Sequence, residues 1–230
     1  MMRDDIAKPL ETSGQDQINR SPALLIGIIG LCCLIEGVLL AADWGFIPIS
    51  RLRLLAYEFA GFWPGLLGSW APNYGLQPVL MFFTYGFLHG GPWHLIVNML
   101  TLWSLGRVVI ERVGEQPFAI IYGLSILGGA IGFGLLAPSL RPMVGASGAL
   151  FGLIGALLAW EFSGRERSRL GWLPVAQTVL ALVLFNILLW WVMRNHLAWE
   201  THLGGFIAGW LVGQVVKPAP KIKPNDDRIE

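Results

Sequence analysis

The chain has 230 residues, a formal net charge of +1, a hydrophobic fraction of 54% and a charged fraction of only 13%. Roughly a quarter of the residues of an ordinary soluble domain are charged, so this composition indicates a membrane protein, and the near-neutral charge gives no reason to expect a nucleic acid partner. The two cysteines, Cys32 and Cys33, are adjacent in an apolar run, which excludes a disulfide framework or a zinc site built on them.

Six apolar runs are long enough to form helices, which predicts an all-α polytopic membrane protein with six transmembrane helices. A spanning helix needs about 20 apolar residues. The runs lie near 22–42, 93–111, 117–137, 147–161, 172–193 and 201–216. The first run exceeds the 7–15 residues typical of a signal-peptide core, so we interpret it as an uncleaved anchor. We therefore expect a short tail at 1–21, one membrane domain at 22–216 and a second tail at 217–230.

The segment between the first two runs has a different composition. Residues 43–92 mix apolar residues with glycine, proline and charge, which predicts a long, partly membrane-embedded loop. Within it, residues 50–62 fit an amphipathic helix lying in the interface. In that helix Arg51, Arg53 and Glu58 would face the water.

The distribution of lysine and arginine predicts the orientation. Of these 16 residues, 12 fall in the two tails and in the segments 107–112 and 165–169. By the positive-inside rule both termini are cytoplasmic, which agrees with an even number of spans. The second, fourth and sixth runs then descend from the outside inward.

Polar side chains gather near the outer ends of these three runs. His94 and Asn98 lie four residues apart on one face of the second run, Ser147 begins the fourth, and Thr201 and His202 begin the sixth. At 1.5 Å per residue, Ser147, Asn98 and His202 each lie about 21–22 Å from a cytoplasmic charge. All three then lie roughly 10 Å below the outer surface of the hydrocarbon core.

Glycines predict that the fourth and sixth runs pack closely. Gly148, Gly152 and Gly155 form one stripe below Ser147, and the sixth run continues the face of His202 with three more glycines, Gly205, Gly209 and Gly213. Faces of small residues let two helix backbones approach. Packing stripe on stripe would bring the hydroxyl and the imidazole within hydrogen-bond reach, as an activated nucleophile requires.

The same region has donors for a negatively charged intermediate. A helix N-terminus at Ser147 favours an anion, and His94 and Asn98 would add side-chain donors. No carboxylate is expected beside His202, because Glu200 should point to the interface. The constellation is therefore predicted to be a Ser–His dyad without the acid of a triad. A polar clamp between helices is the alternative for His94 and Asn98.

Three ordered motifs resemble those of the rhomboid family of intramembrane serine proteases. GASG at 145–148 is similar to the family's glycine-x-serine-glycine motif, HGGPWHLIVN at 89–98 resembles its His-x4-His-x3-Asn signature, and AWETHLGG at 198–205 looks like its catalytic histidine segment. The resemblance covers about residues 40–216. The chain departs from the pattern at Leu80-Met81, where many relatives carry Trp-Arg, and at Glu111, which comes one residue late.

The resemblance implies a serine endopeptidase that cleaves in or near transmembrane segments of membrane-protein substrates, which would enter from the lipid beside the fifth run. It implies that Ser147 is the nucleophile, His202 the base, His94 and Asn98 with the Ser147 N–H the oxyanion hole, and Gly145, Gly148, Phe151 and His89 supporting residues. Gly145 would leave room for substrate, Phe151 would pack on His202, and His89 would hold the first loop. The expected location is a bacterial cytoplasmic membrane, with the site toward the extracytoplasmic side.

Two other functions stay open: a catalytically inactive relative that binds membrane clients, and a small transporter. Polar groups clustered at one depth count against a transport path. We expect no metal and no cofactor, since no set of histidine, cysteine and carboxylate residues has ligand spacing. Glu36, an acid inside the first run, has no partner that the sequence identifies. The oligomeric state and the individual substrate do not follow from the sequence.

Overall fold

The computed structural model describes residues 21–137, 141–165, 172–192 and 197–218. These residues form eight α-helices and two short 3₁₀ helices and contain no strand beyond one isolated bridge, so the prediction of an all-α fold is confirmed. In chain order the elements are α1 (Ala23–Asp43), α2 (Leu52–Ala60), η1 (Pro64–Leu67), α3 (Gln77–Thr84), η2 (Tyr85–Phe87), α4 (Pro92–Val113), α5 (Glu115–Leu136), α6 (Ser147–Arg165), α7 (Leu173–Val192) and α8 (Trp199–Val215).

Five of these helices, α1, α4, α5, α6 and α7, are long and apolar enough to cross a membrane. The sixth predicted span corresponds to α8, which has 17 residues and is shorter than the roughly 20 that a straight span needs. The chain is thus a polytopic helical membrane protein. The count of six spans and the cytoplasmic termini stay predictions, because nearly all of both tails and most of the basic segment 165–169 lie outside the described residues.

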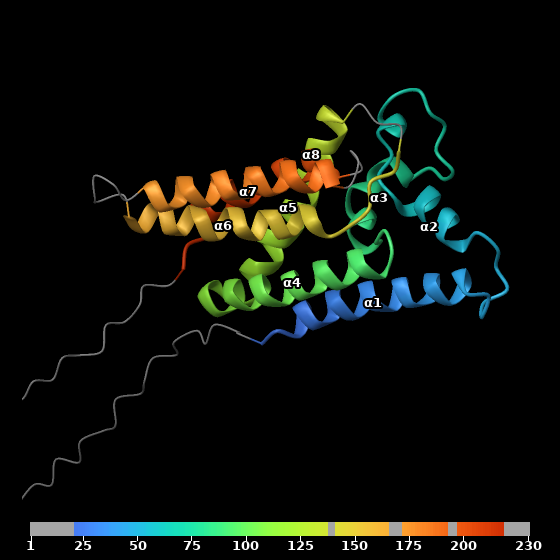
Figure 1. The fold of residues 1–230 in the computed structure, drawn as a ribbon, viewed down its shortest axis with the longest axis horizontal. Helices are drawn as coiled ribbons and strands as arrows, with labels where there is room; N and C mark the ends of the chain where they lie inside the picture. Colours follow the sequence, from blue (N-terminus) through green and yellow to red (C-terminus); the bar gives the residue numbers. More distant parts are fainter. Residues whose placement is uncertain (1–20, 138–140, 166–171, 193–196, 219–230) are drawn as a thin grey trace, which may run out of the picture.

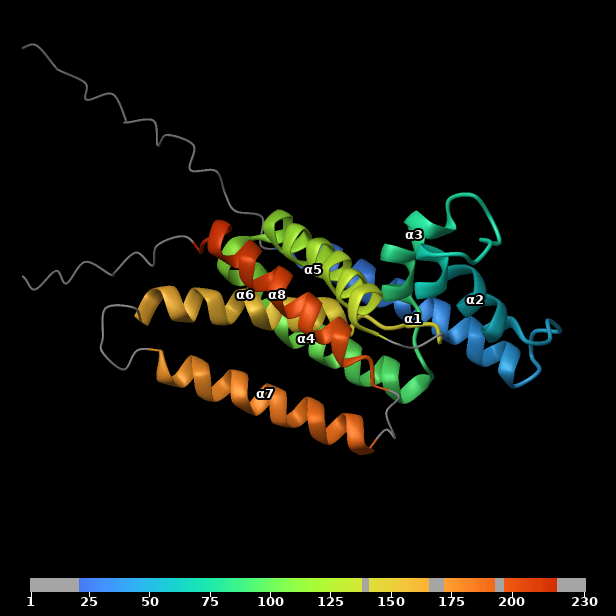
Figure 2. The ribbon, with the colours of Figure 1, turned by 90° about the horizontal axis from the view of Figure 1, so that it is seen from above.

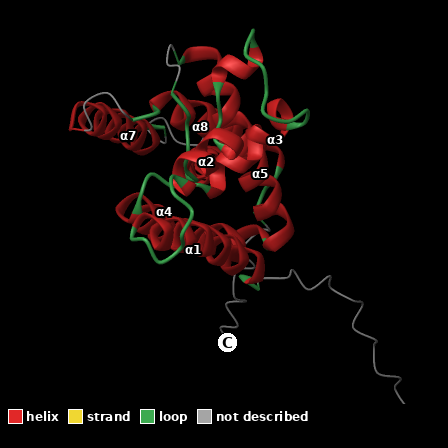
Figure 3. Ribbon diagram, turned by 90° about the vertical axis from the view of Figure 1, so that its right-hand side faces the viewer, coloured by secondary structure: helices red, strands yellow, loops and turns green. Residues whose placement is uncertain are grey.

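The long helices alternate in direction, and α4, α6 and α8 begin at the same end of the bundle (Figures 1 and 2). The helices of the first loop, α2 and α3, lie toward that end. The most extensive packing joins α8 to α6 and to α5. In contrast, α7 stands to one side of the other long helices, and most of its surface is exposed (Figure 3). The second, fourth and sixth predicted runs therefore begin at the same end of the bundle, as the sequence predicted.

Glycine sets the distance between α6 and α8. A Cβ atom on Gly205 would overlap the carbonyl oxygen of Gly148, and one on Gly209 would overlap that of Gly152. On its other side α8 is equally close to α5, since a Cβ on Gly204 would overlap an α5 carbonyl oxygen. The predicted packing of one glycine stripe on the other is therefore confirmed.

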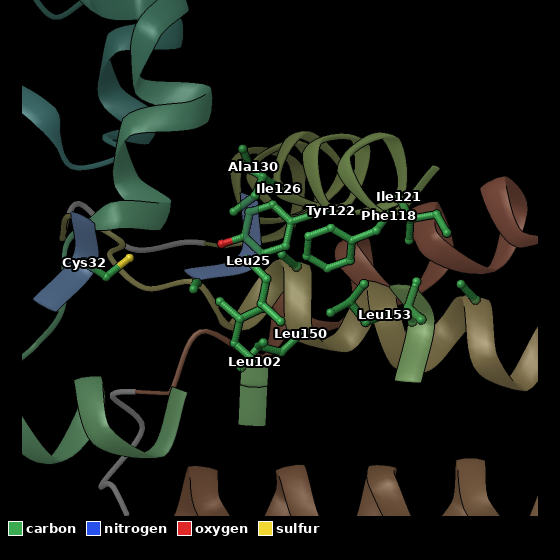
Figure 4. Close-up of a cluster of buried hydrophobic side chains, with 14 of the residues drawn as sticks. Leu25, Cys32, Leu102, Phe118, Ile121, Tyr122, Ile126, Ala130, Leu150 and Leu153 are labelled. Carbon is green, nitrogen blue, oxygen red and sulfur yellow. The ribbon is translucent and has the colours of Figure 1, made fainter. Parts of the chain in front are cut away.

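The hydrophobic core joins α1, α4, α5 and α6 (Figure 4). Leu25 of α1, Leu102 of α4, Phe118 and Ile121 of α5 and Leu153 of α6 are fully buried in it. Lipid tails are as apolar as these side chains, so in a bilayer such residues stabilise the bundle by close packing rather than by escape from water.

The predicted amphipathic helix of the first loop is α2, but the placement of Arg53 on the water side was wrong. Its guanidinium turns inward and binds Glu36 of α1 through two hydrogen bonds of 2.8 and 3.0 Å. Its Nε donates to Asp43 at 2.7 Å. The Glu36 side chain is 1% exposed, and a carboxylate buried that deeply needs an opposite charge. Arg53 is thus the partner that the sequence did not identify.

Candidate active site

Ser147 and His202 lie side by side where α6 and α8 begin. Ser147 is the first residue of α6, and His202 lies in the first turn of α8. The Ser147 Oγ is 2.9 Å from the His202 Nε2, within the normal range for a hydrogen bond. His202 is 6% exposed and Ser147 is half-buried. The two side chains, 55 residues apart in the chain, are therefore positioned as a nucleophile and a base require.

The segment that leads into α6 is fixed by the first loop. The backbones of Met143 and Phe62 exchange two hydrogen bonds, and the Gly145 N–H donates to the Tyr85 carbonyl at 3.0 Å. The Tyr85 hydroxyl in turn donates to the Ile126 carbonyl of α5 at 2.7 Å. These bonds determine where the first turn of α6 lies, and with it the N–H groups of that turn.

The face of the His202 ring is covered by Phe151. The two ring centroids are 4.2 Å apart and the planes differ by 8°. Phe151 lies one turn after Ser147 on α6, so a single helix presents the hydroxyl to the edge of the imidazole and an aromatic ring to its face. This is the contact that the resemblance implied for Phe151.

The second nitrogen of His202 has a partner that the sequence did not indicate. The His202 Nδ1 lies 2.5 Å from the Oδ1 of Asn186, on α7. The signal for Asn186 was a carboxamide in the middle of an apolar run, nine residues after the only other carboxamide of α7, Gln177. Polar side chains in the middle of a transmembrane segment usually have a function. It was missed because only the helices that descend from the outside were compared.

Glu200 was expected at the interface, and this was wrong. It is 7% exposed, because the first turn of α8 packs into the bundle. The Glu200 carbonyl oxygen lies 2.6 Å from where a Cβ on Gly132 of α5 would stand. The group that meets the Nδ1 of His202 is the carboxamide of Asn186 and not this carboxylate.

The imidazole of His94, in the first turn of α4, faces Gly145. A Cβ on Gly145 would lie 2.8 Å from the His94 Cε1 and 3.0 Å from its Nε2. Gly145 also has φ of 130°, which L side chains rarely adopt. The His94 Nδ1 accepts a hydrogen bond of 3.1 Å from the Gly90 N–H, so a neutral His94 carries its proton on Nε2. The space beside Gly145 is thus filled by an imidazole ring that presents a hydrogen-bond donor.

Asn98 is buried one turn further along α4, at 4% exposure. Its Nδ2 donates to the His94 carbonyl at 2.8 Å. An amide nitrogen carries two donors, so this bond uses one of them. The Asn98 Oδ1 is buried without a hydrogen-bond partner.

His89 is fully buried beside His94, with ring centroids 5.3 Å apart. Burial, and then the proximity of His94, lowers the pKa of His89 to about 4, so its ring is neutral at pH 7. Its carbonyl accepts hydrogen bonds from the Tyr57 hydroxyl at 2.7 Å and from Arg53 at 3.3 Å. The His89–Gly90 peptide is therefore held by the first loop on one side and by His94 on the other.

An apolar cleft of about 500 Å³ opens between α7 and α8 and reaches the site. His202 and Asn186 contribute its polar lining, and aliphatic and aromatic side chains such as Leu182, Trp190 and Phe206 form the rest. Among the residues that the structure describes, no three metal-ligating side chains come together.

The sequence of this chain is similar to those of several known proteins. A family model described as a rhomboid domain matches residues 77–219, more than half of the chain. The chain is 32% identical over 140 residues to RHOMBOID-like protein 5 of Arabidopsis thaliana, covering 58% of this chain and 43% of that protein. It is 33% identical over 122 residues to Rhomboid protease GluP of Bacillus subtilis, covering 53% and 23% respectively. It thus spans less than half the length of these relatives. The matched residues include the whole candidate site and exclude α1 and α2.

Proposed function

Because this chain belongs to the rhomboid family, we propose that it is an intramembrane serine protease that hydrolyses peptide bonds in or near transmembrane segments of other membrane proteins. One observation supports this more than any other. The hydroxyl of Ser147 and the Nε2 of His202 are 2.9 Å apart inside a bundle of apolar helices. A hydroxyl beside a neutral imidazole is the arrangement that activates a serine for acyl transfer.

The proposed reaction begins with attack of the Ser147 Oγ on the substrate carbonyl carbon. His202 Nε2 takes the hydroxyl proton, and the carbonyl oxygen becomes an oxyanion. His202 then returns the proton to the leaving nitrogen as the C–N bond breaks, which leaves an acyl ester on Ser147. A water molecule, deprotonated by the same imidazole, hydrolyses that ester and regenerates the hydroxyl.

The oxyanion would be met by three kinds of donor. The Ser147 N–H lies at the N-terminus of α6, where helix N–H groups lack intrahelical partners. His94 presents its Nε2–H beside Gly145, and Asn98 keeps a second amide N–H. Preorganised donors of this kind usually provide the largest part of transition-state stabilisation in acyl transfer.

The substrate would reach the site through the apolar cleft between α7 and α8. Its lining suits a transmembrane segment better than a soluble peptide, since Leu182, Trp190 and Phe206 present hydrocarbon. We also propose that the site faces the extracytoplasmic side of a bacterial cytoplasmic membrane. The lysine and arginine distribution supports that orientation.

A serine-directed fluorophosphonate tests whether Ser147 is activated. The purified parent protein in detergent should be labelled, and the Ser147→Ala and His202→Ala variants should not. The control is Ser125→Ala, since Ser125 is a buried serine on α5 whose hydroxyl lies against Gly152 of α6. Equal labelling of the parent and Ser147→Ala would contradict the proposal and favour an inactive relative that only binds membrane clients.

A further inference from the structure

The side chain of Asn186 joins α7 to the imidazole of His202. Its Oδ1 is 2.5 Å from the His202 Nδ1, and its Nδ2 donates to the Leu182 carbonyl, one turn earlier on α7, at 2.9 Å. The bond to Leu182 distinguishes the nitrogen of the Asn186 amide from its oxygen. The Leu182 carbonyl can only accept a hydrogen bond, so the atom that faces it must be the nitrogen.

Every other proton in the chain of hydrogen bonds follows from that orientation. The Asn186 Oδ1 can only accept, so the His202 Nδ1 must carry a hydrogen. A neutral His202 then has a bare Nε2, which accepts from the hydroxyl of Ser147 across the 2.9 Å contact. The backbone of α7 thus determines, through one amide, the tautomer in which His202 can act as a base.

We propose that Asn186 is a positioning residue that fixes the tautomer and the ring orientation of His202, so that Ser147, His202 and Asn186 act as a Ser–His–Asn chain. This inference rests on the proposed function. An amide can replace the acid of a triad, because orientation of the imidazole needs an acceptor and not a charge. Phe151 holds the ring face, and Asn186 sets the rotation of the ring within that plane.

The contact between Asn186 and His202 depends on the position of α7, which packs only loosely on the other helices. Most of the α7 surface is exposed, and α7 packs less extensively on the bundle than α8 does. The nucleophile and base come from α6 and α8, which glycine packing holds tightly together. The third member therefore comes from the least firmly held of the long helices, and a change at Asn186 can alter the base without moving the nucleophile.

The test measures the rate of fluorophosphonate labelling of purified protein in detergent as a function of pH, together with kcat and KM for a model transmembrane substrate. Asn186→Leu keeps the approximate shape and removes the acceptor. Asn186→Asp keeps an acceptor oxygen and adds negative charge. Thr178→Val is the matched control, because the Thr178 hydroxyl bonds the α7 backbone at Pro174 in the way that the Asn186 amide bonds Leu182.

We expect Asn186→Leu to slow labelling about 10- to 100-fold, part of the 10²–10⁴-fold that a positioned base contributes. The same loss should appear in kcat more than in KM. Asn186→Asp should remain within about tenfold of the parent, and its activity should rise only at higher pH, because a carboxylate favours the protonated imidazole. His94, on α4, is the titratable neighbour whose charge would affect His202. It is present in both variants, so a difference between their pH profiles comes from position 186. Thr178→Val should match the parent.

Two outcomes would overturn the inference and leave the proposed function standing. One is an Asn186→Leu protein that is labelled at the parent rate across the pH range. The other is equal slowing by Leu and Asp with the parent's pH profile, which would show a purely structural role. If Asn186→Leu does not accumulate, the pH profile of Asn186→Asp decides alone: a shift supports the inference and no shift refutes it. A parent protein labelled no better than Ser147→Ala would refute the proposed function itself.

Discussion

The ring of Phe151 lies parallel to the imidazole of His202, with centroids 4.2 Å apart. Aromatic pairs contribute about 0.5–1.5 kcal/mol beyond the area they bury. We therefore expect Phe151→Ala to lower kcat by up to about tenfold, since 1.36 kcal/mol corresponds to a factor of ten. Phe151→Tyr keeps the ring and should retain activity. Steady-state kinetics on a transmembrane substrate would check both, and an Ala variant as active as the parent would remove this ring from the site.

Gly145 combines a φ of 130° with a close approach to His94. Gly145→Ala should therefore strain the backbone by about 1–3 kcal/mol and push the His94 ring away from the proposed oxyanion position. The expected result is loss of most activity with the bundle still folded. Gly123→Ala on α5 is the control, since a Cβ there would meet nothing within 4 Å. Equal activity of the two variants would show that the space beside His94 is not needed.

Arg53 neutralises the buried carboxylate of Glu36. Removing one partner of a buried pair leaves an uncompensated charge and typically costs about 3–5 kcal/mol. We expect Arg53→Gln to lower the melting temperature in detergent clearly, whereas Arg51→Gln, at an exposed neighbour, should not. The double variant with Glu36→Gln should recover part of the loss, because no charge then remains buried. A double variant no more stable than Arg53→Gln alone would show that the pair does not act by neutralisation.

Asn98 uses one of its two amide hydrogens in a bond to the α4 backbone, which leaves one for the proposed oxyanion hole. Loss of one oxyanion donor costs on the order of 10²- to 10³-fold in kcat. Asn98→Ala should show a loss near the lower end of that range with little change in KM. Thr101→Ala, which removes a hydroxyl bonded to the same helix at Val97, is the control. Full activity of Asn98→Ala would leave Asn98 as a helix clamp.

Much of the site could be predicted because its determinants are local in sequence. Helix starts at Ser147 and near His202 follow from the ends of apolar runs, and glycine spacing predicts which faces of α6 and α8 meet. The rise of 1.5 Å per residue in a helix predicts that Ser147 and His202 lie at the same depth in the membrane. Each of these inferences depends on one helix, or on two helices with matching stripes.

The contacts that the sequence did not predict depend on how a helix is rotated about its axis and on how it packs against its neighbours. The sequence of α7 carries three polar residues, Gln177, Thr178 and Asn186, but no small-residue stripe that shows which way the helix faces. Asn186 therefore could not be assigned to His202. The pairing of Arg53 with Glu36 depends on α2 lying against α1, which amphipathic spacing does not determine. Glu200 was placed wrongly because a charged side chain is expected at the membrane interface, whereas the first turn of α8 is packed inside the bundle.

We propose that Ser147 and His202 together cleave a peptide bond within the membrane. The most direct test is hydrolysis of a model single-pass transmembrane substrate by the purified protein in detergent, with the cut located by mass spectrometry. The parent should cleave in or near the transmembrane segment, and Ser147→Ala and His202→Ala should each lose nearly all turnover, since paired groups act as a unit. Undiminished cleavage by Ser147→Ala would show that Ser147 is not the nucleophile.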